Sequence, residues 1–251
     1  MRSITLFRYS MKYILFTLIF LPGFLTSHAQ LSKKYPGYEQ QHFQSMRYGF
    51  FKPAGYDKNK SYPLVIYLHG SRDTVSRDMV WYQESVQKQN PVFVITPKCE
   101  NPDQGWGNTW TGGHTIATAS TLKLIDSLAT VYNIDRDRLY LYGISMGGFG
   151  VFSIVAKEKG KFAAAYAICG GSAVNAAPQL MDTPLWIFHG DADDVVPVYL
   201  SRDVYKEIIK LGGKKVKYTE YPGVKHNSWE NVSQEKALIP WVLAQRKEKL
   251  K

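Results

Sequence analysis

The feature that most constrains the fold is an apolar run that ends in a serine flanked by glycines. Residues 139–144 read Leu-Tyr-Leu-Tyr-Gly-Ile, and Ser145 follows them in the pattern G-x-S-x-G. Residues 149–155 then place apolar side chains at helical spacing. A strand, a sharp turn and a helix in this order lift a serine hydroxyl above the edge of a sheet, and the glycines permit the backbone crowding of so tight a turn. The stretch therefore predicts a nucleophile at Ser145.

Spacing excludes two other uses of a glycine-rich turn. The stretch lacks the G-x-G-x-x-G pattern of a dinucleotide site, and the apolar run 162–168 ends in Cys-Gly-Gly with no acidic residue for a ribose. No Lys-Ser or Lys-Thr pair follows the glycines, so a phosphate-binding loop is excluded as well. What remains is a nucleophile turn, or a plain strand-to-helix turn that holds an incidental serine.

The N-terminus has the organisation of a secretory signal. Three basic residues within the first twelve precede an almost wholly apolar run, residues 13–25, and Ser-His-Ala follows at 27–29. Small residues at that point suit a signal peptidase, and the run is short for a membrane span. We therefore expect a signal peptide over 1–29, cut after Ala29. The expected mature protein is secreted or periplasmic and has no stable membrane anchor.

The rest of the chain, residues 30–251, suits one α/β catalytic domain with a large core. The full chain carries a net charge of +10. Its basic residues are not interleaved with aromatic ones in the manner of a nucleic-acid-binding protein, so we expect a solvated basic surface and no nucleic-acid partner. Two cysteines, Cys99 and Cys169, are too few for a disulfide scaffold. They can form one bridge or remain two buried thiols.

Hydrophobic periodicity predicts alternating strands and helices after a polar, extended lead-in at 30–46. The expected strands are 46–53, 63–68, 91–97, 139–144, 162–168, 184–188 and 216–221. The expected helices are 79–87, 117–131, 149–155, 197–211 and 241–247, the last opened by Pro240. Such alternation is typical of an α/β fold with a mainly parallel, twisted sheet and helices on both faces. No long insertion indicates a large lid.

Residues with chemical potential follow several of these strands. Ligands of a parallel sheet sit beyond the carboxyl ends of its strands. Five residues stand at such ends in this sequence, namely His69, Trp106, Ser145, Asp193 and His226. This clustering predicts a site along that edge of the sheet.

A serine nucleophile needs a base within hydrogen-bond reach, and the base needs an acid that fixes its tautomer. Among the six histidines, only His226 lies both after the acidic cluster and past the last strand, which gives the chain order serine, acid, histidine. Asp191, Asp193 and Asp194 compete for the acid position, and helix capping or loop solvation would explain each of them. The residue pattern alone leaves the choice among these acids open.

An acyl-transfer site also needs two donors for the oxyanion that forms on the carbonyl. The first is expected to be the backbone N–H of Met146, where the helix after Ser145 begins. The second comes from the loop after His69, and we assign it to Ser71 with Arg72 as the alternative. His69 itself is expected to hold this loop by hydrogen bonding rather than to take part in chemistry.

Three tryptophans, Trp106, Trp110 and Trp229, fall in loops at the same edge. Exposed rings in these places suit stacking on a sugar or a feruloyl ring, whereas buried rings would anchor the loops. The sequence gives these two roles equal weight. It contains no metal-ligand motif, and the expected chemistry needs neither a metal nor a cofactor.

Four segments carry a resemblance to a known family: 62–70 (YPLVIYLHG), 137–148 (DRLYLYGISMGG), 188–197 (FHGDADDVVP) and 221–229 (YPGVKHNSW). With them, residues 30–251 resemble secreted α/β-hydrolases of the esterase and prolyl-oligopeptidase-like superfamily. The nearest group comprises small carbohydrate esterases of the feruloyl and acetyl-xylan type, often labelled predicted peptidases or phospholipase/carboxylesterases. The resemblance implies that Asp193, four residues before Pro197, is the catalytic acid. Residues 71–74 depart from the family's small residues and Gly-Glu, which bears on the second oxyanion donor.

The resemblance and the residue pattern together predict a serine carboxylic-ester hydrolase. Its expected substrates are acyl groups on plant or other polysaccharides, with an ester-bearing carbohydrate or a small aryl or acyl ester as the bound molecule. A serine peptidase that acts on short peptides is one alternative. The other is an inactive carbohydrate-binding homologue, although the chain keeps all three residue types of a triad. Acyl specificity, alcohol specificity and oligomeric state stay open.

Overall fold

The computed structural model describes residues 28–71 and 79–247, with side chains from residue 30 onward. The predicted signal segment, residues 1–29, lies outside the described residues except for the backbone of its last two. Arg72, the alternative second oxyanion donor, also lies outside them.

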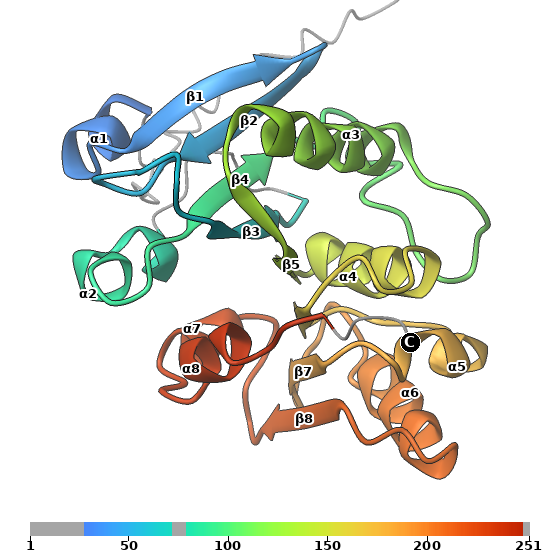
Figure 1. Cartoon of the computed structure of the whole chain (residues 1–251). Coiled ribbons are helices and arrows are strands. Elements are labelled where there is room, and N and C mark those ends of the chain that lie inside the picture. The colour runs from blue at the N-terminus through green and yellow to red at the C-terminus, as the bar shows by residue number, and fades with distance from the viewer. Residues whose placement is uncertain (1–27, 72–78, 248–251) are drawn as a thin grey trace, which may run out of the picture.

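One mixed sheet organises the described residues, with the strand order β1-β2-β4-β3-β5-β6-β7-β8 (Figure 1). The strands are β1 (Tyr38–Phe43), β2 (Met46–Phe51), β3 (Tyr62–Leu68), β4 (Phe93–Pro97), β5 (Ile134–Ile144), β6 (Ala164–Ile168), β7 (Leu185–Gly190) and β8 (Val216–Tyr221). β2 pairs antiparallel with β1 and β4, and every other pair is parallel. The parallel strands therefore present their carboxyl ends along one edge, as the sequence predicts.

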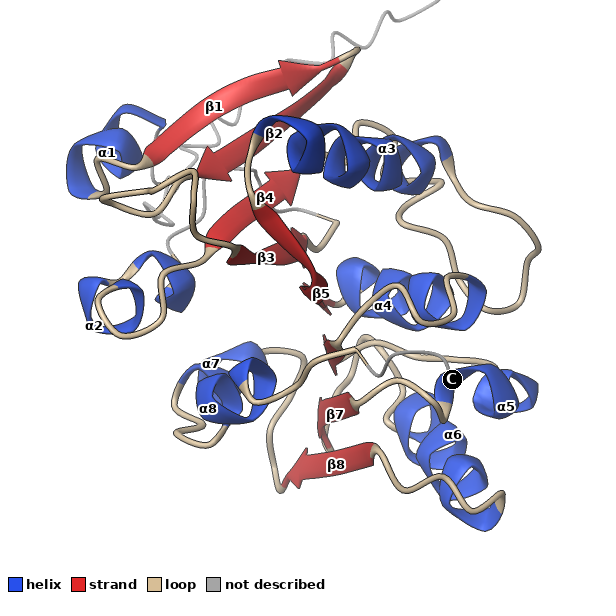
Figure 2. Cartoon of the chain, in the orientation of Figure 1, coloured by secondary structure: helices blue, strands red, loops and turns tan. Residues whose placement is uncertain are grey.

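Helices cover both faces of this sheet (Figure 2). They are α1 (His28–Lys34), η1 (Val80–Tyr82), α2 (Glu84–Gln87), α3 (Ile116–Val131), α4 (Met146–Lys157), η2 (Val174–Ala176), α5 (Ala177–Leu180), α6 (Tyr199–Lys210), α7 (Trp229–Ser233) and α8 (Leu238–Leu243). Residues of α3, α4, α5 and α6 pack in one core cluster, and residues of α1, α2, α7 and α8 pack in the other. None of the described helices is both long enough and apolar enough to cross a bilayer.

Strand β3 shows why the apolar runs of the sequence are continuous. Leu64, Ile66 and Leu68 face the core cluster under α3 and α4, whereas Val65 and Tyr67 face the cluster on the opposite side. Successive side chains of a strand point to opposite faces, so a strand covered on both faces needs apolar residues at every position. All seven residues of β3 are buried.

The expectation of an extended lead-in at 30–46 is wrong. The segment forms α1 and then β1, which pairs in full register with β2 as a hairpin. Leu31, Tyr35 and Tyr38 are buried, and the two tyrosine rings contact Tyr82 with centroids 5.4 and 5.6 Å apart. The polar residues of β1 lie on the outside of an edge strand, where charges and polar groups are favoured.

Some elements in the second half also differ from the expected ones. β5 begins at Ile134, which already pairs with Tyr62, five residues before the start of the expected strand 139–144. α5 and α7 are short helices that the periodicity did not reveal. α8 begins two residues before Pro240. Proline is tolerated there because the first N–H groups of a helix have no partner within it.

Candidate active site

The backbone of Ser145 has the strained conformation of a sharp strand-to-helix turn. Its φ is 54° and its ψ is −115°, between the end of β5 and the start of α4. A Cβ atom on Gly143 would lie 2.3 Å from the carbonyl oxygen of Gly147, and one on Gly147 would lie 1.9 Å from that of Leu68. Both positions therefore require glycine. A strain of about 1–3 kcal/mol persists at such sites only where the surrounding packing enforces it.

The structure brings Ser145, His226 and Asp193 into one hydrogen-bonded line. Nε2 of His226 lies 2.9 Å from Oγ of Ser145. Nδ1 of the same ring lies 2.8 Å from Oδ2 and 3.0 Å from Oδ1 of Asp193. With its Nδ1 proton fixed on the carboxylate, the imidazole presents the Nε2 lone pair to the serine hydroxyl. This is the arrangement that a general base requires.

Asp193 is the buried member of the line. Its side chain has no exposed surface, and its Oδ1 accepts hydrogen bonds from the backbone N–H groups of Val195 and Val196 at 2.9 and 2.8 Å. Burial alone would raise the pKa of this carboxyl, but the hydrogen bonds from His226 and the two backbone groups outweigh it, so the pKa is lowered. Asp193 is therefore charged beside the imidazole.

The other two acids of the cluster have different partners. Asp191 accepts a hydrogen bond from the backbone N–H of Gly223 at 2.6 Å, and Asp194 pairs with Lys225 at 3.2 Å on the surface. Their geometry leaves Asp193 as the one acid of the three whose carboxylate contacts His226 among the described hydrogen bonds.

The two predicted oxyanion donors lie beside Ser145. Met146 is the first residue of α4. The first hydrogen bond of this helix is donated by the N–H of Phe149 to the carbonyl of Ser145, at 3.0 Å. The N–H of Met146 therefore has no partner within the helix. Gly70 faces the nucleophile, because a Cβ built on it would lie 3.8 Å from that of Ser145. Ser71 follows Gly70 directly and is exposed. The Met146 N–H is therefore available to an oxyanion at Ser145, and the assignment of Ser71 as the second donor stays a prediction.

His69 and Trp106 fix the loops behind the site. Nε2 of His69 accepts a hydrogen bond from the backbone N–H of Cys99 at 3.0 Å, which confirms its expected role in holding the loop. The ring of Trp106 is fully buried, and its N–H donates to the backbone carbonyl of His69 at 2.9 Å. A buried ring offers no face to a dissolved sugar. For Trp106 the structure therefore favours the anchoring role over substrate contact.

A polar pocket of about 340 Å³ opens directly at the nucleophile. It is lined by the loop 102–108 and Trp110 on one side, and by Ser145, Met146 and Phe149 on the other. Trp110 is 51% exposed, and its ring lies 6.0 Å from that of Phe149. An exposed ring at the wall of a polar pocket is suited to stacking on the apolar face of a sugar.

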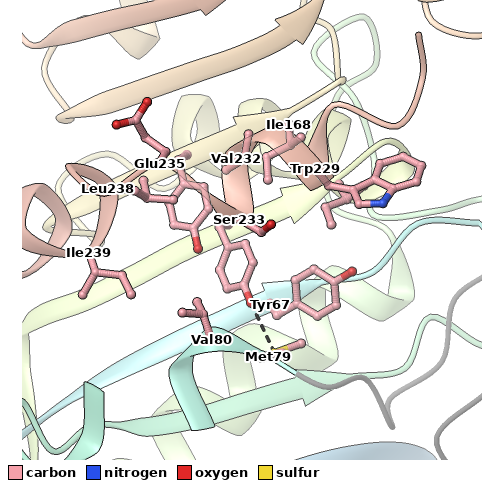
Figure 3. A pocket seen from close by; sticks show the side chains of 13 residues that line it. Tyr67, Met79, Val80, Ile168, Trp229, Val232, Ser233, Glu235, Leu238 and Ile239 are labelled. Carbon is pink, nitrogen blue, oxygen red and sulfur yellow. Dashed lines mark hydrogen bonds between the residues drawn. The ribbon is translucent and has the colours of Figure 1, made fainter. Parts of the chain in front are cut away.

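An apolar pocket of about 150 Å³ lies on the other face of the sheet, between η1 and the α7–α8 pair (Figure 3). Ile144 and Ile168, at the ends of β5 and β6, line it together with Trp229. Ile144 immediately precedes Ser145, and the ring of Trp229 contacts that of His226 with centroids 5.8 Å apart. Of the three predicted tryptophans, Trp229 therefore adjoins both the apolar pocket and the base.

The two cysteines are separate, buried thiols. Three potential metal ligands lie within 4.8 Å of one another: Sγ of Cys169, a carboxylate oxygen of Asp193 and a ring nitrogen of His226. Cysteine binds metals as a thiolate, and burial raises the pKa of Cys169 to about 12, so its thiol is protonated. Since Asp193 and His226 already bond to each other, this cluster is suited to a hydrogen-bonded line rather than to a metal ion.

Two contacts of the site were not expected from the sequence. His189, the last histidine before Asp193, has no exposed surface, and its Nε2 lies 3.2 Å from Oδ2 of Asp193. Lys157 of α4 donates hydrogen bonds to the backbone carbonyls of Asn108 and Gly113, at 3.0 and 2.7 Å, and so ties down the loop that carries Trp110. The position of His189 at a strand end, four residues before an acid, is the one signal that would have marked it.

Comparison with known proteins gives an independent view of the chain. Residues 41–246 match the family model described as "Putative esterase". The bifunctional acetylxylan esterase/xylanase XynS20E of Neocallimastix patriciarum is 31% identical over 137 residues, which are 53% of this chain and 20% of that protein. Acyl-protein thioesterase 1 of Debaryomyces hansenii is 26% identical over 197 residues, which are 66% of this chain and 84% of the thioesterase.

A solved structure described as a thermostable esterase agrees over most of the fold. It superposes with a TM-score of 0.77 at 32% identity, and the match covers 85% of this chain and 64% of that one. The chain thus spans a fifth of the xylan-active relative and just under two thirds of the solved esterase. From the family model and this superposition, the chain belongs to the esterase family and has the α/β-hydrolase fold, without a large lid among its described residues.

Proposed function

We propose that the chain is a secreted serine esterase that removes acyl groups from plant or other polysaccharides. The observation that carries the proposal is the hydrogen-bonded line from Asp193 through His226 to Ser145, which ends where the polar pocket opens. The esterase family supports the reaction class. The N-terminal signal pattern supports secretion.

In the proposed reaction, Oγ of Ser145 attacks the ester carbonyl while Nε2 of His226 takes the hydroxyl proton. The bond to the sugar oxygen then breaks, and His226 returns the proton to that oxygen as the alcohol leaves. A water molecule, deprotonated by His226, attacks the acyl-serine and releases the carboxylic acid with a free Ser145. Asp193 stays ionised and stabilises the imidazolium that forms in each half.

The backbone N–H groups of Met146 and Ser71 would stabilise the oxyanion. Each such donor contributes about 2.7–4 kcal/mol to transition-state stabilisation when it is aimed at the oxygen. Met146 is fixed by α4, whereas Ser71 depends on the loop after Gly70. In this proposal the second donor is the more sensitive of the two to changes in loop conformation.

The two pockets support an assignment of the two halves of the substrate. The polar pocket, with its exposed Trp110, suits the sugar that carries the ester. The apolar pocket beside Ile144 and Trp229 suits the acyl group. An apolar cavity of about 150 Å³ holds a molecule the size of benzene. A short acyl group or a single aromatic ring therefore fits within the pocket.

The test is a substrate panel with purified protein. We compare kcat/KM of the wild type and of Ser145→Ala on four kinds of substrate. These are acetylated sugar esters, feruloylated sugar esters, a long-chain thioester, and an amide that carries the same acyl group as one of the esters. We expect turnover of the sugar esters above that of the amide, and its loss in the variant. A preference for the amide would indicate the peptidase alternative, and ester turnover that persists in Ser145→Ala would reject the serine mechanism. N-terminal sequencing of the exported protein should begin at Gln30.

A further inference from the structure

A second histidine, in addition to His226, lies against the carboxylate of Asp193. His189 is at the carboxyl end of β7 and has no exposed surface. Its Nδ1 lies 2.9 Å from Oγ of Ser201, and its Nε2 lies 2.9 Å from the carbonyl oxygen of Val196 and 3.2 Å from Oδ2 of Asp193. Both ring nitrogens therefore have polar partners in a fully enclosed place.

The partners determine which nitrogen of His189 carries the proton. Burial lowers the pKa of His189, so the ring is neutral and has a single N–H group. Oγ of Ser201 lies 2.9 Å from both Nδ1 of His189 and the carbonyl oxygen of Gly170, and its single proton can be donated to only one of them. Nε2 faces a carbonyl and a carboxylate, both of which are acceptors only, so a ring without a proton on Nε2 would set its lone pair against two acceptors, one of them charged. The proton therefore sits on Nε2 and is directed at Val196, with Asp193 beside it. With the proton on Nε2, Nδ1 accepts the proton of the Ser201 hydroxyl in place of the Gly170 carbonyl.

The Nε2 proton of His189 lies next to the carboxylate of Asp193. Oδ2 of Asp193 stands between two imidazoles, with Nδ1 of His226 at 2.8 Å and Nε2 of His189 at 3.2 Å. Oδ1 is bound by the N–H groups of Val195 and Val196. Because the same Nε2 proton binds the carbonyl of Val196, the ring also fixes the turn that supplies those two N–H groups. His189 thus restrains both oxygens of the carboxylate.

We propose that His189 is a positioning residue for the reaction, which holds the carboxylate of Asp193 in the orientation that His226 requires. The proposal rests on the proposed function, since it concerns the acid of that catalytic line. His189 acts through Asp193 and has no exposed surface with which to touch a substrate. A small displacement of the Asp193 carboxylate would rotate the imidazole ring of His226, so that Nε2 no longer points at Oγ of Ser145. Positional errors near 1 Å cost about a hundredfold in rate.

A pair of amide substitutions separates the two nitrogens of the ring. In His189→Gln, the side-chain nitrogen can reach the place of Nε2 and donate to Val196 beside Asp193. In His189→Asn, the shorter side chain reaches only the place of Nδ1 and keeps the contact with Ser201. We expect His189→Gln to retain kcat within about threefold of the wild type. We expect His189→Asn to lose about ten- to a hundredfold in kcat with little change in KM.

Ser201→Ala is the matched control, since it removes the Nδ1 partner and leaves the Nε2 donor in place. It should keep the wild-type kcat even if it lowers the unfolding temperature. The proposal is overturned if His189→Asn keeps the wild-type kcat, if the two amide variants lose kcat equally, or if His189→Gln is the more impaired of the two. Each of these results would assign His189 a purely structural role.

A spectroscopic measurement makes the test independent of the substrate. The proton that Nδ1 of His226 donates to the buried carboxylate of Asp193 should give a downfield ¹H resonance in the wild type, identified by its absence in His226→Ala. We expect this resonance to persist in His189→Gln and to shift or broaden in His189→Asn. An unchanged resonance in His189→Asn overturns the proposal. If the wild type shows the resonance but hydrolyses no ester, the proposed function fails while the positioning role is still tested.

Discussion

The ring of Trp229 stands edge-on to the imidazole of His226, with centroids 5.8 Å apart and planes at 88°. The same tryptophan lines the apolar pocket (Figure 3). The base and the pocket therefore share a wall. If the apolar pocket binds the acyl group, as proposed, that group would contact the ring that packs against His226, and acyl binding should influence the orientation of the imidazole through Trp229.

Replacement of Trp229 by alanine tests this shared wall. The variant loses an aromatic face of the pocket and the contact with His226. We expect KM for an aryl ester to rise about tenfold, because burial of a large apolar side chain is worth roughly 1.5–3 kcal/mol. KM for an acetyl ester should change little, while kcat falls for both. Steady-state kinetics on the two esters measures this, with Trp241→Ala as control, since Trp241 packs on Trp186 outside the pocket. Equal changes in KM for both esters would contradict the acyl assignment.

Trp110 provides the matching test for the sugar side. Its ring is half exposed at the wall of the polar pocket. In Trp110→Ala we expect KM for an acetylated oligosaccharide to rise about three- to tenfold, since aromatic contacts of this kind contribute roughly 0.5–1.5 kcal/mol. Hydrolysis of a nitrophenyl acetate should be unaffected, because that ester has no sugar to stack. A parallel loss on both substrates would show that the ring supports the loop rather than the sugar.

Lys157 anchors residues 108–113, the loop that carries Trp110, by hydrogen bonds to its backbone. Its ammonium donates to two backbone carbonyls of that loop and to the hydroxyl of Ser153, and burial lowers its pKa. Lys157→Met should lower the unfolding free energy by about 1–3 kcal/mol, the cost of hydrogen bonds left without their charged donor. It should also raise KM for the oligosaccharide ester. Lys161→Met, which removes only a 3.6 Å ion pair with Asp126, is the control in urea unfolding. Similar losses in the two variants would refute the anchoring role.

The charge of Asp193 should make stability depend on pH in a defined window. Its pKa is lowered from 3.8, because the hydrogen bonds to its charged form outweigh the effect of burial. Because the pKa of this carboxyl is lower in the folded state than in the unfolded state, its ionised form contributes to the unfolding free energy above the pKa of the unfolded state. This contribution is lost as the pH falls through the pKa of the folded state. The difference in unfolding free energy between the wild type and Asp193→Asn should therefore shrink as the pH is lowered below the ordinary aspartate pKa of 3.8. Urea unfolding across this range measures it, and a difference independent of pH would argue against a charged Asp193.

The location of the site could be predicted because the fold is a parallel sheet. Ser145 and His226 are 81 residues apart in the chain, and Asp193 and His226 are 33 apart. Their positions just after predicted strands were sufficient to place them along one edge. The residue types alone left the choice among the acids open, whereas the family resemblance implied Asp193. Loop contacts, such as that of Asp191 with Gly223, agree with that choice.

Roles that depend on burial could not be predicted from residue type. Trp106 and Trp110 lie four residues apart in one loop, yet the first is fully buried and the second is half exposed. In sequence, His189 resembles any histidine at a strand end, and only the fold brings it against Asp193. The hairpin of β1 and β2 was missed for a related reason, since the outer face of an edge strand is polar and its pattern is that of a loop.

The central claim is that Ser145 is the nucleophile and that His226 activates it. Covalent labelling with a fluorophosphonate, followed by peptide mass mapping, tests this without any assumption about the natural substrate. The account predicts a single adduct on Ser145 in the wild type and a labelling rate at least about a thousandfold lower in His226→Ala, as expected for residues that act as a unit. An adduct on another residue, or equal labelling rates in the two proteins, would contradict it.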